Sequence, residues 1–410
     1  MLSKEDNELL TRTGPGTPMG ALLRRYWLPA LLSEELPEPD GRPVRVPLLG
    51  ERLVAFRDSS GQVGLLEEAC PHRGASLALG RNEDGALRCI YHGWQFDRSG
   101  RCTDMPTERP GSPFPERVRA QAYPTREIAG IVWAYLGPPD RLPPFPDFVW
   151  LKLYPARAAA FKILEECNWA QALEGGLDMA HAPILHRSAP WSVRDDDVRQ
   201  RNLAPRHEVQ LTPYGLRYGA IWDQDDGAQH VRIISYIAPW WTITSPGSFG
   251  SRTTSADRVA NAWVPRDDVS AWHFQYYFNP EQPIDVPWRI ATAGYEVDEH
   301  YRKLRNRDNG YLQDATAMRT ESVSGIRGVI TQDHAVNESQ GPIVDRTKEH
   351  LAACDVAAIA MRKLLLDAAR GLGDDQPPPG LDPNISYARV LSETIEASAG
   401  VPWQTVGCWD

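Results

Sequence analysis

Two short segments, each with one cysteine and one histidine, constrain this chain more than any other feature. They read Cys70-Pro-His72 and Cys89-Ile-Tyr-His92, with sixteen residues between His72 and Cys89. Structural zinc sites usually pair like ligands, as Cys-x(2–4)-Cys and His-x(3–5)-His. Here each segment mixes the two ligand types. That pattern suits a [2Fe–2S] centre in which two cysteines hold one iron and two histidines hold the other. A zinc-stabilised binding protein is the alternative.

The rest of the composition limits the class of protein. Six cysteines in 410 residues are too few for a disulfide scaffold, and Cys102, Cys167, Cys354 and Cys408 have no histidine beside them. The chain begins with a polar, charged segment and has no run of roughly 18 apolar residues, so we expect no secretory leader, no membrane span and a cytoplasmic location. A net charge of −10 and a pI near 5.6 argue against a nucleic-acid partner.

The pattern of the sequence changes along the chain. Short β-like runs separated by glycine turns occupy residues 44–136, and the proline-rich stretch 138–146 is typical of a linker. Beyond it, helical patterns at 165–180 and 346–372 enclose strand-like runs between 207 and 277. We therefore predict an α+β protein with a helical segment over 1–40, an all-β domain over 41–145 and a second domain over 146–410.

Carboxylates and histidines gather near the start of the second domain. Glu174, Asp178 and His181 stand at i, i+4 and i+7, the spacing of one helical face, and His186 follows Pro183, where we expect the helix to break. Two histidines with one distant carboxylate form the 2-His-1-carboxylate set that leaves open positions on Fe(II). Alone, these residues would indicate only a polar helix. Beside the Cys/His segments, they favour a second metal.

Both constellations resemble those of the Rieske non-haem iron aromatic-ring-hydroxylating oxygenases, in particular the catalytic (α) subunits of the phthalate dioxygenase-like branch. The segments beginning at Cys70 and Cys89 match the Rieske signature, including the aromatic residue and glycine after His92. The resemblance implies that Cys70, His72, Cys89 and His92 hold the cluster, and that His181 and His186 bind Fe(II).

The resemblance also implies roles for the nearby carboxylates. Asp178 would hydrogen-bond an iron-bound histidine and a cluster histidine of a neighbouring subunit, and Glu174 would be structural or part of that acidic relay. The stretch from Gln332 onward resembles the segment in which an aspartate closes the iron triad. Asp333 is the candidate there, with Glu338 and Asp345 as fallbacks that would otherwise cap or brace a helix.

The expected activity is likewise an implication of the resemblance. It implies a helix-grip catalytic domain (an antiparallel sheet plus helices) and a homotrimer or dimer of trimers. A separate NAD(P)H-dependent reductase, with a flavin and a [2Fe–2S] centre, would supply electrons, since this chain lacks a Gly-x-Gly-x-x-Gly turn. The expected reaction is O2-dependent dihydroxylation of a small aromatic carboxylate, as in the breakdown of aromatic compounds. A monooxygenase or O-demethylase acting on an aryl ether and a non-oxygenase Rieske electron carrier are the alternatives.

The substrate pocket is predicted from residue type and position. Arg232, among apolar residues of a predicted strand, is the first candidate to pair with a substrate carboxylate, followed by Arg206 and Arg187. Large apolar side chains on the strands and near the iron motif would form the walls. These candidates are Trp240, Trp241 and Ile330, with Trp191, Trp222 and Phe249 as further possibilities.

Overall fold

Small antiparallel sheets make up the part of the chain before residue 137, as the short apolar runs predict. The computed structural model describes residues 1–187, 202–225, 227–244, 257–373 and 377–405. After helices α1 (Lys4–Thr11) and α2 (Pro18–Leu23), the chain forms three sheets, with strand orders β1-β10-β9, β2-β3-β4 and β5-β6-β7-β8. Their bounds are β1 Trp27–Leu32, β2 Val44–Leu48, β3 Glu51–Arg57, β4 Val63–Glu67, β5 Arg81–Glu83, β6 Ala86–Arg88, β7 Gln95–Asp97, β8 Cys102–Asp104, β9 Thr125–Ile128 and β10 Ile131–Tyr135, with α3 at Phe114–Arg117.

One large antiparallel sheet forms the centre of the rest of the chain. Its strand order is β11-β17-β16-β15-β14-β13-β12, and β18 adds to β14. The central strands are buried along nearly their whole length, as expected for strands with both faces covered. The bounds are β11 Ala158–Glu165, β12 Arg206–Thr212, β13 Gly215–Asp223, β14 Gln229–Ile237, β15 Trp241–Thr244, β16 Arg258–Pro265, β17 Ala271–Phe278 and β18 Thr394–Ala397.

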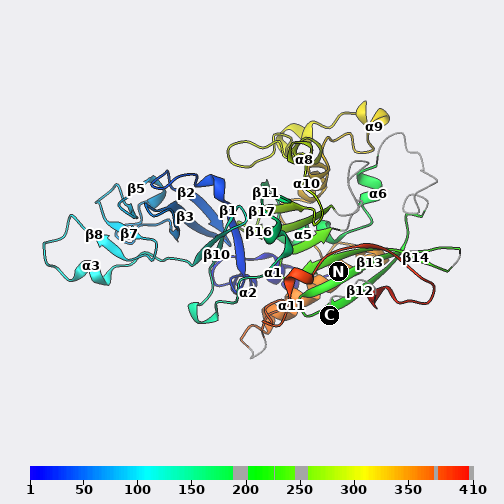
Figure 1. The fold of residues 1–410 in the computed structure, drawn as a ribbon, viewed down its shortest axis with the longest axis horizontal. Helices are drawn as coiled ribbons and strands as arrows, with labels where there is room; N and C mark the ends of the chain where they lie inside the picture. The colour runs from blue at the N-terminus through cyan, green and yellow to red at the C-terminus, as the bar shows by residue number, and fades with distance from the viewer. Residues whose placement is uncertain (188–201, 226, 245–256, 374–376, 406–410) are drawn as a thin grey trace.

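Helices α4, α5, α8, α10 and α11 pack against this sheet, and two short helices, α6 and α9, lie in the connections (Figure 1). Their bounds are α4 Val149–Leu153, α5 Trp169–Leu177, α6 Ala182–Leu185, α8 Val286–Ala293, α9 Ala317–Thr320, α10 Val329–Ser339 and α11 Val356–Arg370. The fold is α+β, as predicted. Among the described residues, no helix combines the length and the apolar character that crossing a membrane would require.

Helix α5 lies unusually close to its neighbours because two glycines face them. A Cβ on Gly176 would lie 2.0 Å from the Trp263 ring of β16, and one on Gly175 would lie 2.8 Å from the Asn337 side chain of α10. Glycine lowers helix propensity, but here it permits the close approach of backbone to side chain. This packing brings the end of α5 and the face of α10 together, and both carry candidate site residues.

The helix bounds differ from those predicted. The helix predicted over 165–180 is confined to α5, because residues up to Glu165 form β11 and the side chain of Asn168 accepts a hydrogen bond from the Ala170 amide as the N-cap. It ends before Asp178, so Asp178 and His181 do not continue its face. Pro183 lies inside α6 and does not break a helix. The helix predicted from 346 begins only at Val356.

A buried ion pair joins the two parts of the chain. Lys162 of β11 donates to both carboxylate oxygens of Glu35, at 2.7 and 2.9 Å, and its ammonium lies 4.1 Å from the Trp272 ring centroid. Burial lowers the pKa of Lys162, against the opposing effect of Glu35. The pair therefore contributes to the packing of the segment after β1 against the large sheet.

Replacing Lys162 by methionine should destabilise the protein markedly. The change leaves the carboxylate of Glu35 buried without its cation, which typically costs about 3–5 kcal/mol. The shift of the urea unfolding midpoint measures the effect. Lys363→Met is the matched control, because its pair with Asp367 is exposed and should contribute little. An equal shift for both variants would contradict this role.

Candidate metal centres

The two Cys/His segments form facing loops, one between β4 and β5 and one between β6 and β7. Cys70 and Cys89 are both 2% exposed, while the rings of His72 and His92 are half-buried with centroids 4.3 Å apart. In each loop a backbone N–H four residues on donates to the cysteine carbonyl, from Gly74 to Cys70 and from Gly93 to Cys89. These tight turns place the four predicted ligand residues at one end of the small-sheet part.

The donors of this site suit a cationic centre. Nδ1 of His72 is buried and has no hydrogen-bond partner among the described residues, and the Trp94 ring stacks on the imidazole at 4.2 Å. Burial raises the pKa of Cys70 to about 11, and the adjacent Cys89 adds to the shift. A thiol in this setting becomes a thiolate when a metal replaces its proton. Two buried thiols facing two imidazoles are the ligand set that a Rieske cluster uses.

The second constellation converges on Asp333, which α10 carries. Nε2 of His186 lies 3.0 Å and Nε2 of His181 lies 3.5 Å from Oδ1 of Asp333. This oxygen is buried and accepts no well-formed hydrogen bond among the described residues. The three side chains offer ligand atoms within 4.8 Å of one another, the arrangement expected around one metal ion.

Neighbouring residues orient both imidazoles. Nδ1 of His186 lies 2.7 Å from Oε1 of Gln332, whose amide N–H donates to the Ile326 carbonyl, so an oxygen faces the ring and Nδ1 carries the proton. Nδ1 of His181 faces the Asp178 carboxylate at 3.3 Å in the same way. Each Nε2 therefore points toward Oδ1 of Asp333. Gln332 has no signal in the sequence beyond its place next to Asp333.

Electrostatics couple these residues strongly. Burial opposes the protonation of His181, but Asp178 and Asp333 outweigh it and raise its pKa to about 10. Burial also acts to raise the pKa of Asp333, yet the two histidines lower it well below its usual value. The pKa of Asp178 is likewise lowered by His181 against the effect of burial. Two carboxylates around His181 thus favour a positive charge, which a divalent metal would supply.

Glu174 has a different environment. Its Oε1 accepts hydrogen bonds from Arg346 at 3.0 Å and from Arg362 at 2.7 Å, and Arg362 also pairs with Glu349. These contacts tie α5 to the segment before α11 and to α11 itself. Of the two roles left open for Glu174, they support the structural one. The fallback ligands also lie elsewhere: Glu338 pairs with Lys303 in the interior, and Asp345 pairs with Lys348 at the surface.

A cavity beside His181, His186 and Asp333 contains two of the predicted substrate residues. Arg232 of β14 and Ile330 of α10 line it, and they are 7% and 5% exposed. Further polar groups come from strands β15 to β17, through Thr244, Asn261, His273 and Gln275, and from Asp178, His334 and Asn337. Arg206 pairs with Glu208 and Asp223 in an exposed position, and Arg187 is buried outside this lining. The structure therefore brings Arg232, of the three arginines, to the candidate metal centre.

Trp240 and Trp241 are placed elsewhere, which corrects the prediction for them. They line a separate cavity of about 400 Å³ with Phe145, Phe148 and Tyr387. The reason is the direction of β15: Trp241 begins the strand, whereas Thr244 at its other end reaches the metal-centre cavity. Trp222 is also absent from the described lining of the metal-centre cavity. Trp191 and Phe249 lie outside the described residues.

A second group of possible ligands was missed from the sequence. Glu165, His273 and His334 also present three atoms within 4.8 Å of one another, and all three residues are buried. His334 follows Asp333, and His273 lies on β17 with its ring in the cavity wall. In contrast to Asp333, Glu165 has protein donors on both oxygens: Asn337 donates to Oε1 and Trp263 to Oε2, each at 2.9 Å.

Comparison with known families covers nearly the whole chain. A family model of the Rieske [2Fe-2S] domain matches residues 26–124, and one described as LigXa C-terminal domain like matches residues 134–408.

Curated relatives match over nearly full length. The oxygenase subunit of phthalate 4,5-dioxygenase from Pseudomonas putida is 38% identical over 98% of this chain and 94% of its own. The oxygenase subunit of 3-chlorobenzoate-3,4-dioxygenase from Comamonas testosteroni is 36% identical over 99% and 98%. That of 5,5'-dehydrodivanillate O-demethylase from a Sphingobium species is 33% identical over 95% and 86%.

Solved structures share the fold. Dicamba monooxygenase bound to dicamba superposes with a TM-score of 0.60 at 19% identity, covering 85% of this chain and 98% of the other. A theobromine complex of a mutant NdmA from Pseudomonas putida gives a TM-score of 0.62 at 20% identity, covering 86% and 92%.

Proposed function

The chain belongs to the Rieske oxygenases, as an oxygenase subunit, and on that premise we propose that it oxidises an aromatic carboxylate with O2. The observation that carries the proposal is the cavity in which Arg232 lies beside His181, His186 and Asp333. A cation near an open-sided metal site suits an anionic substrate whose ring must face that site. The relatives named for phthalate and 3-chlorobenzoate point to the same class of substrate.

Each metal centre has its own set of residues in this proposal. Cys70, His72, Cys89 and His92 hold the [2Fe–2S] cluster. His181, His186 and Asp333 hold Fe(II), because all three line the cavity and Oδ1 of Asp333 has no well-formed hydrogen bond among the described residues. Glu165, His273 and His334 are the weaker candidates for this iron, since protein donors already satisfy both oxygens of Glu165.

The protein's own side chains bind the substrate, orient the metal ligands and exclude water. When bound, the two centres supply single electrons and a site at which O2 is activated. Asp178 and Gln332 hold the two imidazoles by their Nδ1 protons, which fixes the direction of each Nε2. Arg232 binds the substrate carboxylate, and Ile330 with the Trp263 ring supplies apolar wall. The buried strands around the cavity keep bulk water away from the reacting ring.

Electrons pass between subunits in the proposed assembly. In Figure 1 the strands β7 and β8, next to the Rieske loops, lie at one end of the molecule, and α6, next to His181 and His186, lies toward the other. A homotrimer, or a dimer of trimers, would place the loops of one chain against Asp178 of the next.

We further propose that the chain divides into its three parts at residues 40 and 145, that the protein is cytoplasmic, and that a separate reductase with a flavin and a [2Fe–2S] centre supplies the electrons. The segment 1–40 is not wholly helical as predicted, because it contains strand β1, whose pairing with β10 attaches it to the Rieske part.

A single-turnover experiment tests the function. Anaerobically purified and chemically reduced protein is mixed with 18O2 and, in separate samples, phthalate, 3-chlorobenzoate, an aryl methyl ether and an uncharged aromatic. We expect labelled product from the carboxylates, read by mass spectrometry. Two labelled oxygens indicate dihydroxylation, and loss of a methyl group indicates O-demethylation, as the name of the Sphingobium relative suggests. No product from iron-loaded, red-brown protein with any aromatic carboxylate would refute the substrate class.

Replacing Arg232 by leucine should weaken the binding of aromatic carboxylates selectively. Loss of a charge-assisted hydrogen bond costs about 1.5–3 kcal/mol, which corresponds to roughly 10–150-fold in KM. The KM for an uncharged analogue should change little. Arg206→Leu is the control, because Arg206 is exposed and away from the cavity. If the aromatic carboxylate and its uncharged analogue lost affinity equally, Arg232 would contribute to the packing of the cavity wall and would not bind the carboxylate.

A further inference from the structure

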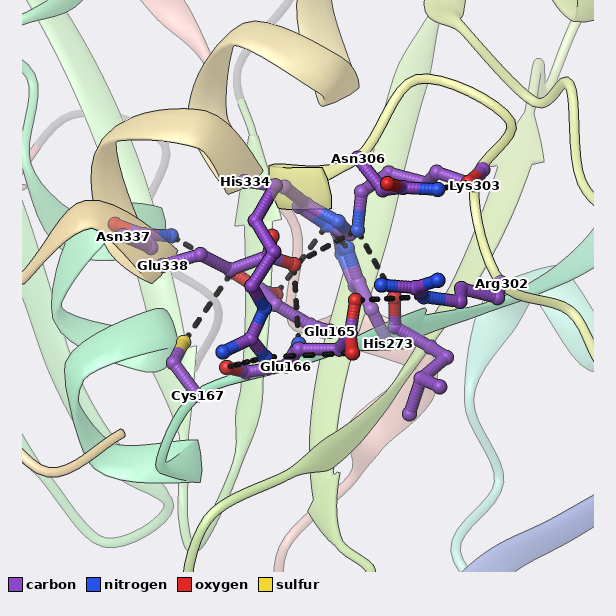
Figure 2. A network of polar contacts seen from close by, with 12 residues as sticks. Glu165, Glu166, Cys167, His273, Arg302, Lys303, Asn306, His334, Asn337 and Glu338 are labelled. Carbon is purple, nitrogen blue, oxygen red and sulfur yellow. Dashed lines mark hydrogen bonds and ion pairs between the residues drawn. The ribbon is translucent and has the colours of Figure 1, made fainter. Parts of the chain in front are cut away.

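A line of buried polar side chains runs from β11 to the wall of the substrate cavity; Figure 2 shows its Glu165, His334 and His273. Nε2 of His334 lies 3.3 Å from Oε2 of Glu165 and 2.9 Å from Nδ1 of His273. Nε2 of His273 then lies 3.3 Å from Oδ1 of Asn261. Glu165 is 0% exposed, and His273 and Asn261 both line the cavity.

The orientation of Asn261 determines the tautomer of His273. The Asn261 amide nitrogen donates to the Thr244 hydroxyl at 3.3 Å, and its oxygen accepts from the Gln275 amide at 2.5 Å. Since an oxygen faces the ring, Nε2 of His273 carries the proton. Its Nδ1 must then accept, so the donor in the contact with His334 is Nε2–H of His334.

The far end of the line requires the same arrangement. Both oxygens of Glu165 accept hydrogen bonds, from Asn337 and from the Trp263 indole. Oε2 of Glu165 is therefore an acceptor that faces Nε2–H of His334. Glu165 and His273 share this one N–H. The nearby pair of Lys303 and Glu338, at 2.8 Å, is internally balanced (Figure 2). Both ends of the line thus favour one proton arrangement.

We propose that Glu165 and His334 are positioning residues that hold His273 and Asn261 in one hydrogen-bonding state. The part of the cavity wall formed by His273 and Asn261 then presents a fixed pattern of hydrogen-bonding groups, which selects how an aromatic acid lies relative to the iron site. The inference rests on the proposed function for the identity of the ligand. The pattern of hydrogen bonds itself is independent of any substrate.

A matched pair of variants at His334 separates hydrogen bonding from packing. The glutamine of His334→Gln can donate from its amide nitrogen to Glu165 and His273 together, whereas the nearly isosteric methionine of His334→Met can donate to neither. A merely structural role predicts that methionine is tolerated at least as well as glutamine. The positioning role predicts the reverse order in ligand binding.

The measurements use the anaerobic holoenzyme and phthalate as the probe. H334Q should bind phthalate within about threefold of wild type by calorimetry, and H334M about tenfold more weakly, the effect of roughly 1.4 kcal/mol for one unmade hydrogen bond. Infrared spectra with and without 15N-ring-labelled histidine should show a mixture of His273 tautomers in H334M alone. Iron content and melting temperature are measured for each protein.

The outcomes separate this inference from the proposed function. Equal affinity and equal infrared bands in H334Q and H334M would overturn the positioning role. Loss of one metal equivalent from both variants would also overturn it, because Glu165, His273 and His334 would then hold a metal. If wild type bound and oxidised no aromatic carboxylate, the proposed function would fail, and the infrared comparison would still decide the arrangement of the line.

Discussion

An Asp333→Ala variant is expected to purify red-brown, with its Rieske spectrum intact, but with one iron fewer per chain and almost no oxygenase activity. Asp333 is the only carboxylate among the three proposed ligands, and its Oδ1 faces both imidazole Nε2 atoms. Without it, two neutral histidines remain, which bind Fe(II) weakly. The activity should fall by more than about 100-fold, which is the upper end of what the loss of an outer-shell partner costs.

Metal analysis and visible spectroscopy of the same sample measure both parts of this result. Asp345→Ala is the matched control, since Asp345 pairs with Lys348 at the surface and should leave the iron in place. The opposite pattern, with iron retained in Asp333→Ala and lost in His273→Ala, would move the iron to Glu165, His273 and His334. Loss of colour in Asp333→Ala would instead indicate a folding defect that reaches the Rieske part.

The metal-ligand candidates near one another in sequence were predictable because short motifs carry them. Tight turns fix Cys70 with His72, and a single turn and short helix fix His181 with His186. Asp333 needed the family resemblance, because no rule of spacing connects it to residues some 150 positions earlier. The structure makes the connection through α10, which the glycines of α5 allow to approach.

The cavity walls were predicted less well, because they depend on which end of a strand points to the site. Arg232 and Ile330 reach the cavity, while Trp241 begins β15 at the end away from it and Trp240 precedes the strand. The line from Glu165 to His273 had no signal either. Its members come from β11, α10 and β17, and a lone histidine within an aromatic strand such as β17 is typical of core.

The end of helix α5 is another feature that the sequence pattern did not predict. The sequence pattern favoured a helix through Ala180, yet α5 ends at Leu177 and Asp178 takes an extended conformation as the C-cap. That conformation lets the Asp178 carboxylate accept from the Ala180 amide at 2.6 Å and face His181. In a continued helix the Ala180 amide would instead donate to a carbonyl four residues earlier, and the Asp178 carboxylate would lose this backbone contact.

An Asp178→Asn variant should keep both metal centres and lose most of the electron transfer between them. The asparagine can still accept from the Ala180 amide, but it then turns an N–H toward Nδ1–H of His181 or leaves one of the two donors unmet. It also removes the negative charge that favours a cationic partner at this place. We expect reoxidation of the reduced cluster, followed by stopped-flow absorbance in the presence of substrate and O2, to slow by about 10–100-fold or more.

Mixed oligomers locate the step that Asp178 serves. Chains with Cys89→Ala lack the cluster, and chains with His186→Ala lack the iron, so each homo-oligomer alone should be inactive. Co-expressed mixtures should regain part of the activity, because the cluster of one chain then faces the iron of the next. Adding Asp178→Asn to the chain that keeps its iron should abolish the rescue, whereas adding it to the chain that keeps only its cluster should not. If the rescued activity were the same with Asp178→Asn in either chain, the Asp178 carboxylate would not lie on the electron path between subunits. Absence of any rescue in mixed oligomers whose chains each keep their one remaining metal centre would indicate transfer within one chain.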